Sequence, residues 1–273
     1  GDGIIIDLTT PVTGTIIDGL TTELSYTGSN SVLSSSWQGF SDGISGIDYY
    51  EYAIGSTAGT SDIFDWTNIA LDSAVTTTAL NLSHANTYYQ SVQAVDLVSN
   101  VSSVVTTNGI TVDLSAPETG IVIDGLETDQ YWTNSATDLI LSWSGFSDQT
   151  SGISDYEYSL GSQPGSADVI KRTITEGNID STVIQLNDSL KLTDGNTYYG
   201  TIYAADSASN ETAATSNKLV YDLYFGEPSI ADVSHESGSQ LNILDDANIT
   251  FTISEPFASF VASIESSVGD SIL

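Results

Sequence analysis

The stretch SWQGFSDGISGIDYYEYAIGS at residues 36–56 returns as SWSGFSDQTSGISDYEYSLGS at residues 142–162. Trp143 follows Trp37 by 106 residues (143 − 37), and the acidic loop after each Trp keeps the same interval. A second block, NTYYQSVQAVDLVSN, begins at residue 86 and returns as NTYYGTIYAADSASN 110 residues later (196 − 86). A repeat of this length is typical of tandem globular modules, because solenoid repeats have periods of a few tens of residues. Repeated modules favour roles in reach, spacing or multivalency over a single catalytic centre.

Strand signals dominate both copies. Runs of Val, Ile, Thr, Tyr and Ser are broken by Gly, Asn and Asp, and apolar residues alternate at residues 32–37 and 139–143. The sequence contains no convincing amphipathic helix. Many short strands separated by turns predict an all-β chain of antiparallel β-sandwiches, with the two copies arranged end to end.

The repeat also predicts module boundaries. IIIDLTTP at residues 4–11 matches ITVDLSAP at residues 110–117, and each stretch is interpreted as the last strand of one module running into the next. The linkers are short and contain proline, which predicts stiff connections. We therefore expect the end of a preceding module or a linker at residues 1–8, module A at 9–113, module B at 114–222, and part of a third module at 223–273.

The charge of the chain excludes several classes of partner. Its 273 residues include 36 acidic and 4 basic residues, which give a net charge of −32. Nucleic acids and anionic membranes bind clusters of Lys and Arg, so neither is an expected partner, whereas cations are. The chain has no cysteine, which excludes disulfides and thiolate metal sites, and no apolar run long enough to span a bilayer. The absence of methionine, even at residue 1, favours an internal piece of a longer polypeptide.

Each module contains the residues of a known sandwich pattern. A Trp ends an early strand in LSSSW and LILSW, and later a Leu precedes Tyr88 and Tyr198 by six residues (88 − 82). This arrangement resembles the tyrosine corner of the fibronectin type III fold, where the phenol hydroxyl bonds the backbone upstream. The segments SGIxxYEYxxG and AxDxxSN are similar to the fibronectin type III-like and Ig-like repeats of large secreted cell-surface adhesins, of the Bacteroidetes type. The chain departs from the animal modules in its long acidic loop after the Trp strand.

The last segment has a different character. PSIADVSHESGSQLNILDDANITFTISEPFASF, which begins at residue 228, resembles the start of a bacterial Ig-like domain. It lacks the later strands that would close such a sandwich. Two interpretations stay open, namely a truncated segment or a module completed by a strand from another chain through β-augmentation.

Acidic residues recur at the entry of each module. In a fibronectin-like sandwich the incoming chain lies at the end that holds the B–C and F–G loops, so acids from these three segments should meet. Three carboxylates, with backbone carbonyls and Asn100 or Asn210 nearby, suit Ca²⁺, which takes six to eight oxygen ligands. Ca²⁺ bound there would lock the interdomain angle, with a Kd of about 10⁻⁴–10⁻³ M, typical of extracellular modules. The predicted metal ligands are Asp7, Asp42 and Asp96 for module A, and Asp113, Asp148 and Asp206 for module B.

A purely structural role for these acids stays open. Asp148 could cap its own turn, and Asp206 could accept backbone N–H bonds in the F–G turn. Asp113 could be a solvated linker acid. None of the loops has an EF-hand spacing, so the motif alone does not decide between the two roles.

Other chemistry has less support. Trp66 and Trp132 have an Arg and a Tyr at their counterpart positions, so each either plugs a loop against the sandwich or offers a sugar-stacking surface. His84 lies in a turn and His235 in a polar stretch, and no GxSxG elbow surrounds any serine. We therefore expect no enzymatic activity.

Three functions follow from these observations. The first is a non-catalytic stalk of a large adhesin on the surface of a gliding or marine bacterium, which contacts neighbouring modules and projects a distal binding region. The second is a module that itself binds a surface glycan or protein, through the divergent stretches at residues 60–72 and 166–178. The third is a spacer in a secreted multidomain enzyme. Near-identical modules favour the stalk, because a site selected for one ligand usually appears once.

Overall fold

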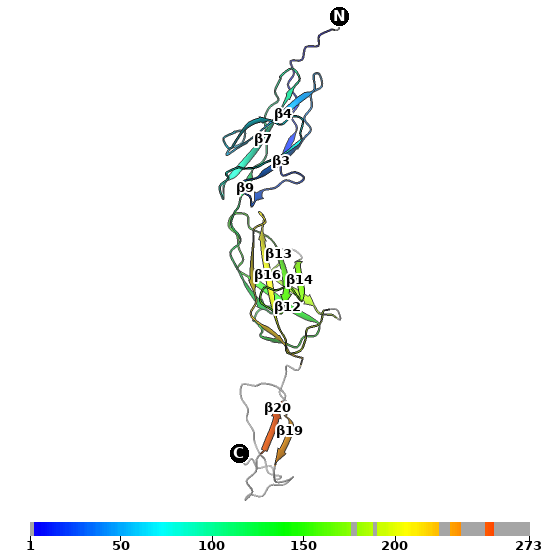
Figure 1. Cartoon of the computed structure of the whole chain (residues 1–273), viewed down its shortest axis with the longest axis vertical. Coiled ribbons are helices and arrows are strands. Elements are labelled where there is room, and N and C mark those ends of the chain that lie inside the picture. Colours follow the sequence, from blue (N-terminus) through cyan, green and yellow to red (C-terminus); the bar gives the residue numbers. More distant parts are fainter. Residues whose placement is uncertain (1–2, 176–178, 188–189, 224–229, 236–248, 254–273) are drawn as a thin grey trace.

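A computed structural model of the chain describes residues 3–175, 179–187, 190–223, 230–235 and 249–253. Every helix or strand assigned in these ranges is a β-strand. Figure 1 shows two β-sandwiches that follow one another along the long axis, and we keep the names module A and module B for them. The predicted all-β tandem architecture is therefore confirmed. Within the described ranges, no helix has the length and apolar character needed to cross a membrane.

Module A consists of two packed sheets. The smaller sheet has the order β1-β3-β6, and the larger has the order β2-β9-β7-β4-β5, with β8 also paired to β7. The strands are β1 (Thr15–Asp18), β2 (Tyr26–Thr27), β3 (Leu33–Gln38), β4 (Ile47–Gly55), β5 (Phe64–Asn68), β6 (Ala74–Thr77), β7 (Thr87–Asp96), β8 (Val105–Thr106) and β9 (Ile110–Val112).

Module B repeats this topology strand for strand. Its smaller sheet has the order β10-β12-β15, and its larger sheet has the order β11-β18-β16-β13-β14, with β17 paired to β16. The strands are β10 (Ile121–Asp124), β11 (Trp132–Thr133), β12 (Asp138–Ser144), β13 (Ile153–Gly161), β14 (Ile170–Ile174), β15 (Ser181–Gln185), β16 (Thr197–Asp206), β17 (Glu211–Thr215) and β18 (Leu219–Tyr221).

One detail departs from the antiparallel prediction. In module A the strand β2 pairs with β9 in parallel, and in module B β11 pairs with β18 in the same way. Each pairing spans two residues, which is too short for an alternating pattern to show in the sequence. The sheets are therefore mixed rather than purely antiparallel.

The repeated Trp anchors each core. Buried and half-buried residues alternate along β3 and end on the buried Trp37, as the two-residue period of a strand requires. Trp37 stacks on Tyr52 with the ring centroids 6.2 Å apart, and Trp143 contacts Tyr156 at 5.4 Å. Truncating such a side chain to Ala costs about 3–5 kcal/mol. The two Trp residues are core residues, as the sequence predicted.

The predicted tyrosine corners are also confirmed. The Tyr88 hydroxyl accepts a hydrogen bond from the Ser83 backbone N–H at 3.0 Å. The Tyr198 hydroxyl accepts one from the Thr193 N–H at 2.8 Å. Each bond ties the loop before β7 or β16 to the strand that follows it, which fixes the end of the sandwich nearest the next segment.

The two cores differ in one polar layer. In module A, Gln90 Nε2 donates to Asp18 Oδ1 at 2.7 Å inside the sandwich. The counterpart of Gln90 in module B is Gly200, and a Cβ added there would lie 2.4 Å from the side chain of Leu141. Leu141 therefore occupies the space of the amide. Asp124, the counterpart of Asp18, stays buried with no hydrogen bond to either carboxylate oxygen.

The two unmatched Trp residues lie in short strands, and their packing against a loop stays a prediction. Trp66 lies in β5, and Arg172 takes the same place in β14. The Arg172 guanidinium lies 3.9 Å from the Tyr203 ring centroid and pairs with Glu157 at 2.5 Å. Trp132 lies in β11, beside the last strand of module B. Sugar stacking at these residues stays a prediction.

For the third segment, expected at residues 223–273, the structure describes Leu223 and the two strands β19 (Ile230–His235) and β20 (Ile249–Ile253). These strands pair in antiparallel fashion. The other residues of this prediction, at 224–229, 236–248 and 254–273, lie outside the described residues.

Candidate metal centre

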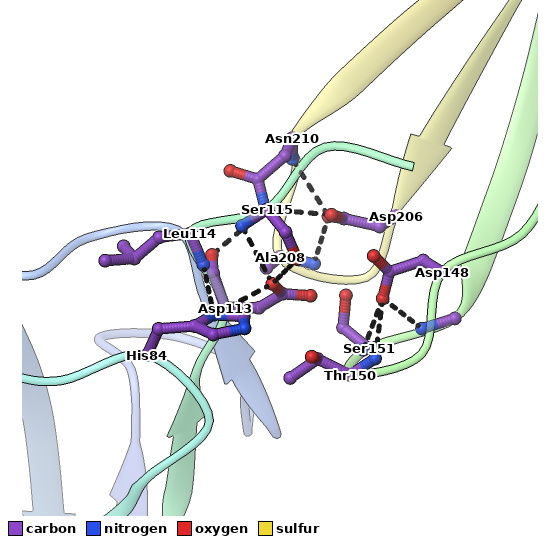
Figure 2. Close-up of polar contacts among 11 residues, drawn as sticks. His84, Asp113, Leu114, Ser115, Asp148, Thr150, Ser151, Asp206, Ala208 and Asn210 are labelled. Atoms are coloured by element: carbon purple, nitrogen blue, oxygen red, sulfur yellow. Dashed lines mark hydrogen bonds and ion pairs between the residues drawn. The ribbon is translucent and has the colours of Figure 1, made fainter. Parts of the chain in front are cut away.

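The structure brings the six predicted aspartates together as two triads. Asp113 follows β9, Asp148 lies in the loop after β12, and Asp206 ends β16. One carboxylate oxygen from each of these residues lies within 4.8 Å of the other two, and we call this set the junction triad (Figure 2). Asp7, Asp42 and Asp96 form the second set, the N-terminal triad. One carboxylate oxygen from each of them also lies within 4.8 Å of the other two.

Asp113, from the linker, is the member of the junction triad with no solvent exposure (0%). Its Oδ1 accepts hydrogen bonds from the backbone N–H and the hydroxyl of Ser115, at 3.0 and 2.7 Å. Its Oδ2 is buried and has no hydrogen-bond partner. The alternative that Asp113 is a solvated linker acid is therefore wrong.

The other two members of the junction triad shape their own loops. Asp148 Oδ1 accepts the N–H groups of residues 150, 151 and 152 at 2.7–3.1 Å. Asp206 Oδ1 accepts the N–H groups of Ala208 and Asn210 at 2.8 and 2.9 Å. The turn-capping alternative is thus present in the structure. For Asp148 it uses one oxygen of the carboxylate, so capping and metal binding are compatible.

The asparagines act as hydrogen-bond donors through Nδ2, and the oxygen ligation that the sequence suggested stays a prediction. Asn210 Nδ2 donates to Asp206 Oδ2 at 2.8 Å and to the Asp113 backbone carbonyl at 3.0 Å. Asn100 Nδ2 donates in the same way to Asp96 Oδ2 at 2.7 Å and to the Asp7 carbonyl at 3.4 Å. Each asparagine therefore holds the incoming linker against the F–G turn of the module that receives it.

Charge accumulates in both triads. Hydrogen bonds from Thr9 lower the pKa of Asp7. Burial alone would raise the pKa of Asp96, but hydrogen bonds from Asn100 outweigh burial and lower it. The same balance lowers the pKa of Asp113, where burial is opposed by the hydroxyl of Ser151 and by Ser115. Asp7, Asp96 and Asp113 are therefore ionised at neutral pH, and adjacent buried carboxylates favour a cation among them.

Module A contributes to the junction from the opposite side, which the sequence did not reveal. His84 Nδ1 accepts the Leu114 N–H at 3.1 Å and lies 3.4 Å from Asp113 Oδ1. A Cβ added to Gly28 would lie 2.8 Å from the Ala208 carbonyl oxygen of module B. The two modules are thus in contact around the linker. The only sequence signal was that Gly28 and His84 have no identical counterpart in module B.

Comparisons with known proteins found similarity to solved structures. No protein family matches the chain, and no curated protein matches it. The FN1–FN3 domains of chicken CNTN1 are 15% identical with a TM-score of 0.42, over 76% of this chain and 68% of that chain. The fibronectin(III)-like modules of Clostridium thermocellum CbhA are 10% identical with a TM-score of 0.46, over 78% of this chain and 97% of that chain. The fibronectin type III-like fold stands on the strand order and tyrosine corners described above.

Proposed function

We propose that this chain is a non-catalytic stalk segment of a large extracellular bacterial adhesin, stiffened by Ca²⁺ where modules join. The observation that carries the proposal is the construction of the joint between modules A and B. The last strand of module A runs directly into Asp113, which is buried in the loops of module B. Because Asp113 ends module A and is enclosed by module B, few residues between the modules are free to move. The two sandwiches follow one another along the long axis (Figure 1).

Contacts on both sides of the linker support a stiff joint. Asn210 of module B holds the Asp113 carbonyl, while His84 of module A holds the Leu114 N–H. Gly28 of module A packs directly against the F–G turn of module B. Relative motion is the default for modules joined by small interfaces, so these contacts set this joint apart. Stiffness is what a stalk needs in order to hold a distal binding region away from a surface.

The charge supports the extracellular part of the proposal. A net charge of −32 repels neighbouring copies of the chain and attracts divalent cations. Extracellular modules bind Ca²⁺ with a Kd of about 10⁻⁴–10⁻³ M, a range suited to calcium-rich surroundings. A spacer in a secreted enzyme would use the same joint and would differ only in the domains that it connects.

Distance measurements between the modules test the proposal. The chain has no cysteine, so Ser103→Cys and Ala213→Cys, at exposed positions in module A and module B, accept one spin label each. We expect a single narrow distance distribution by pulsed electron paramagnetic resonance, and a narrower one with Ca²⁺. A broad distribution typical of a flexible linker, with and without Ca²⁺, would contradict the stalk.

A further inference from the structure

We infer that the two triads are not equivalent, and that the junction triad alone is a preformed Ca²⁺ site. This inference rests on the calcium part of the proposed function and concerns which residues bind the ion. The sequence predicts two copies of one site, because all three aspartates of each triad recur. The hydrogen bonds of the two copies differ.

Two buried oxygen atoms without a hydrogen-bond partner lie at the junction triad, one in the triad and one in a neighbouring side chain. They are Oδ2 of Asp113, which has no solvent exposure, and the hydroxyl of Ser151, which is 8% exposed. Figure 2 shows the Ser151 hydroxyl directed between Asp113 and Asp148. It lies near enough to lower the pKa of Asp113 but completes no hydrogen bond of normal geometry. A buried polar atom without a hydrogen-bond partner destabilises the fold, and a charged one does so more strongly, so both atoms call for a ligand.

In the N-terminal triad, protein donors already satisfy the linker aspartate. Asp7 Oδ1 accepts the backbone N–H and the hydroxyl of Thr9, at 2.9 and 2.6 Å. Asp7 Oδ2 accepts the Ser45 N–H at 3.1 Å, which is the bond that Asp113 Oδ2 lacks. Ser45 is the counterpart of Ser151. In module A this serine donates its backbone N–H to the linker aspartate, whereas in module B its hydroxyl points at the triad without a hydrogen-bond partner. Both oxygens of this linker aspartate are therefore occupied by protein donors.

The ligand set of the junction triad suits a hard cation. It offers three carboxylates and a hydroxyl, and all the donor atoms are oxygens. One carboxylate oxygen from each aspartate lies within 4.8 Å of the other two, so one cation can contact all three. Ca²⁺ accepts an irregular set of several protein oxygens, whereas Mg²⁺ usually keeps several waters and binds one or two carboxylates. The free Oδ2 of Asp113 and the free hydroxyl of Ser151 are thus the atoms expected to bind it.

Calcium titration of the whole chain with matched variants tests this inference. Asp148→Asn removes a charge from the junction triad but keeps a carbonyl oxygen to cap the loop, and Asp42→Asn makes the same change in the N-terminal triad. By isothermal titration calorimetry, we expect Asp148→Asn to remove one site per chain, or to weaken it at least tenfold. Asp42→Asn should leave the titration unchanged. Ser151→Ala should weaken the same site, and its matched control, Ser45→Ala, should not.

Each other outcome has a definite meaning. Equal losses from Asp148→Asn and Asp42→Asn, or tighter binding of Mg²⁺ than of Ca²⁺, would overturn the inference. So would unaltered binding in folded Asp148→Asn and Ser151→Ala chains. If Asp148→Asn fails to fold by circular dichroism, the Ser151→Ala and Ser45→Ala pair decides the question. A narrow distribution of intermodule distances without calcium binding would support the stalk and contradict the calcium site. One calcium site together with a broad distance distribution would support the calcium site and contradict the stalk.

Discussion

Replacing Asp124 by Asn should remove most of the pH dependence of the stability of module B. Asp124 is 2% exposed, and neither carboxylate oxygen has a hydrogen bond. Burial raises its pKa from 3.8 to about 7. Because the folded state holds the proton more tightly than the unfolded state, the stability is fully present below about pH 4 and is lost as the pH rises through 7. A gap of about three pKa units corresponds to about 4 kcal/mol, at 1.36 kcal/mol per unit.

The assay is urea unfolding of the whole chain from pH 4 to pH 8, with and without the substitution. The unfolding transition of module B is identified as the one whose urea midpoint changes in the variant. We expect the difference in unfolding free energy between variant and wild type to grow by about 4 kcal/mol over this range. In thermal unfolding, the same change corresponds to a shift of about 15 °C or more in the difference between the two melting temperatures from pH 4 to pH 8, for a domain of this size.

A matched substitution in module A sharpens the test. The pKa of Asp18 is raised by burial to about 6, but hydrogen bonding from Gln90 opposes the shift. Asp18→Asn should therefore change the pH dependence of module A by a smaller amount, about 3 kcal/mol. Parallel pH profiles for wild type and Asp124→Asn would refute the reasoning. They would mean that water from the adjacent groove, of about 390 Å³, hydrates the carboxylate.

Three further changes probe the joint and the cores. Gly28→Val should broaden the distance distribution between the modules without unfolding either one, because the new side chain meets the Ala208 carbonyl; an unchanged distribution would show that the contact does not hold the joint. Tyr198→Phe should destabilise module B by about 0.5–1.5 kcal/mol in urea unfolding, since the Thr193 N–H loses its acceptor, and a loss no greater than that from Tyr199→Phe would contradict this. Millimolar Ca²⁺ should raise the melting temperature in calorimetry, Asp148→Ala should abolish the increase, and no increase in the wild type would count against a bound ion.

The sandwich could be predicted because its signals are local and strong. Trp37 lies in a strand whose alternating burial follows directly from the two-residue period, and Trp143 takes the same place in β12. Tyr88 and Tyr198 follow a Leu at a spacing that places the phenol against the preceding turn. The meeting of the aspartates was predicted for a different reason. Once the strand order is known, the linker and two loops must share one end of the sandwich.

The details that escaped prediction depend on pairs of residues far apart in the sequence. The contact of Gly28 with Ala208 depends on the angle between modules, which no local pattern encodes. The free hydroxyl of Ser151 and the bonded N–H of Ser45 come from equivalent serines, so residue identity alone cannot distinguish them.

Asp113 is covalently an extension of module A but is enclosed by the loops of module B. A gene duplication that copies a module together with the aspartate that precedes it would copy both halves of the joint. These are the linker aspartate and the loops that enclose it. Such a polypeptide could lengthen or shorten by whole repeats while every new connection formed without redesign. Module B expressed on its own should therefore begin before Asp113, because a boundary after this residue would remove the side chain that the loops of module B enclose.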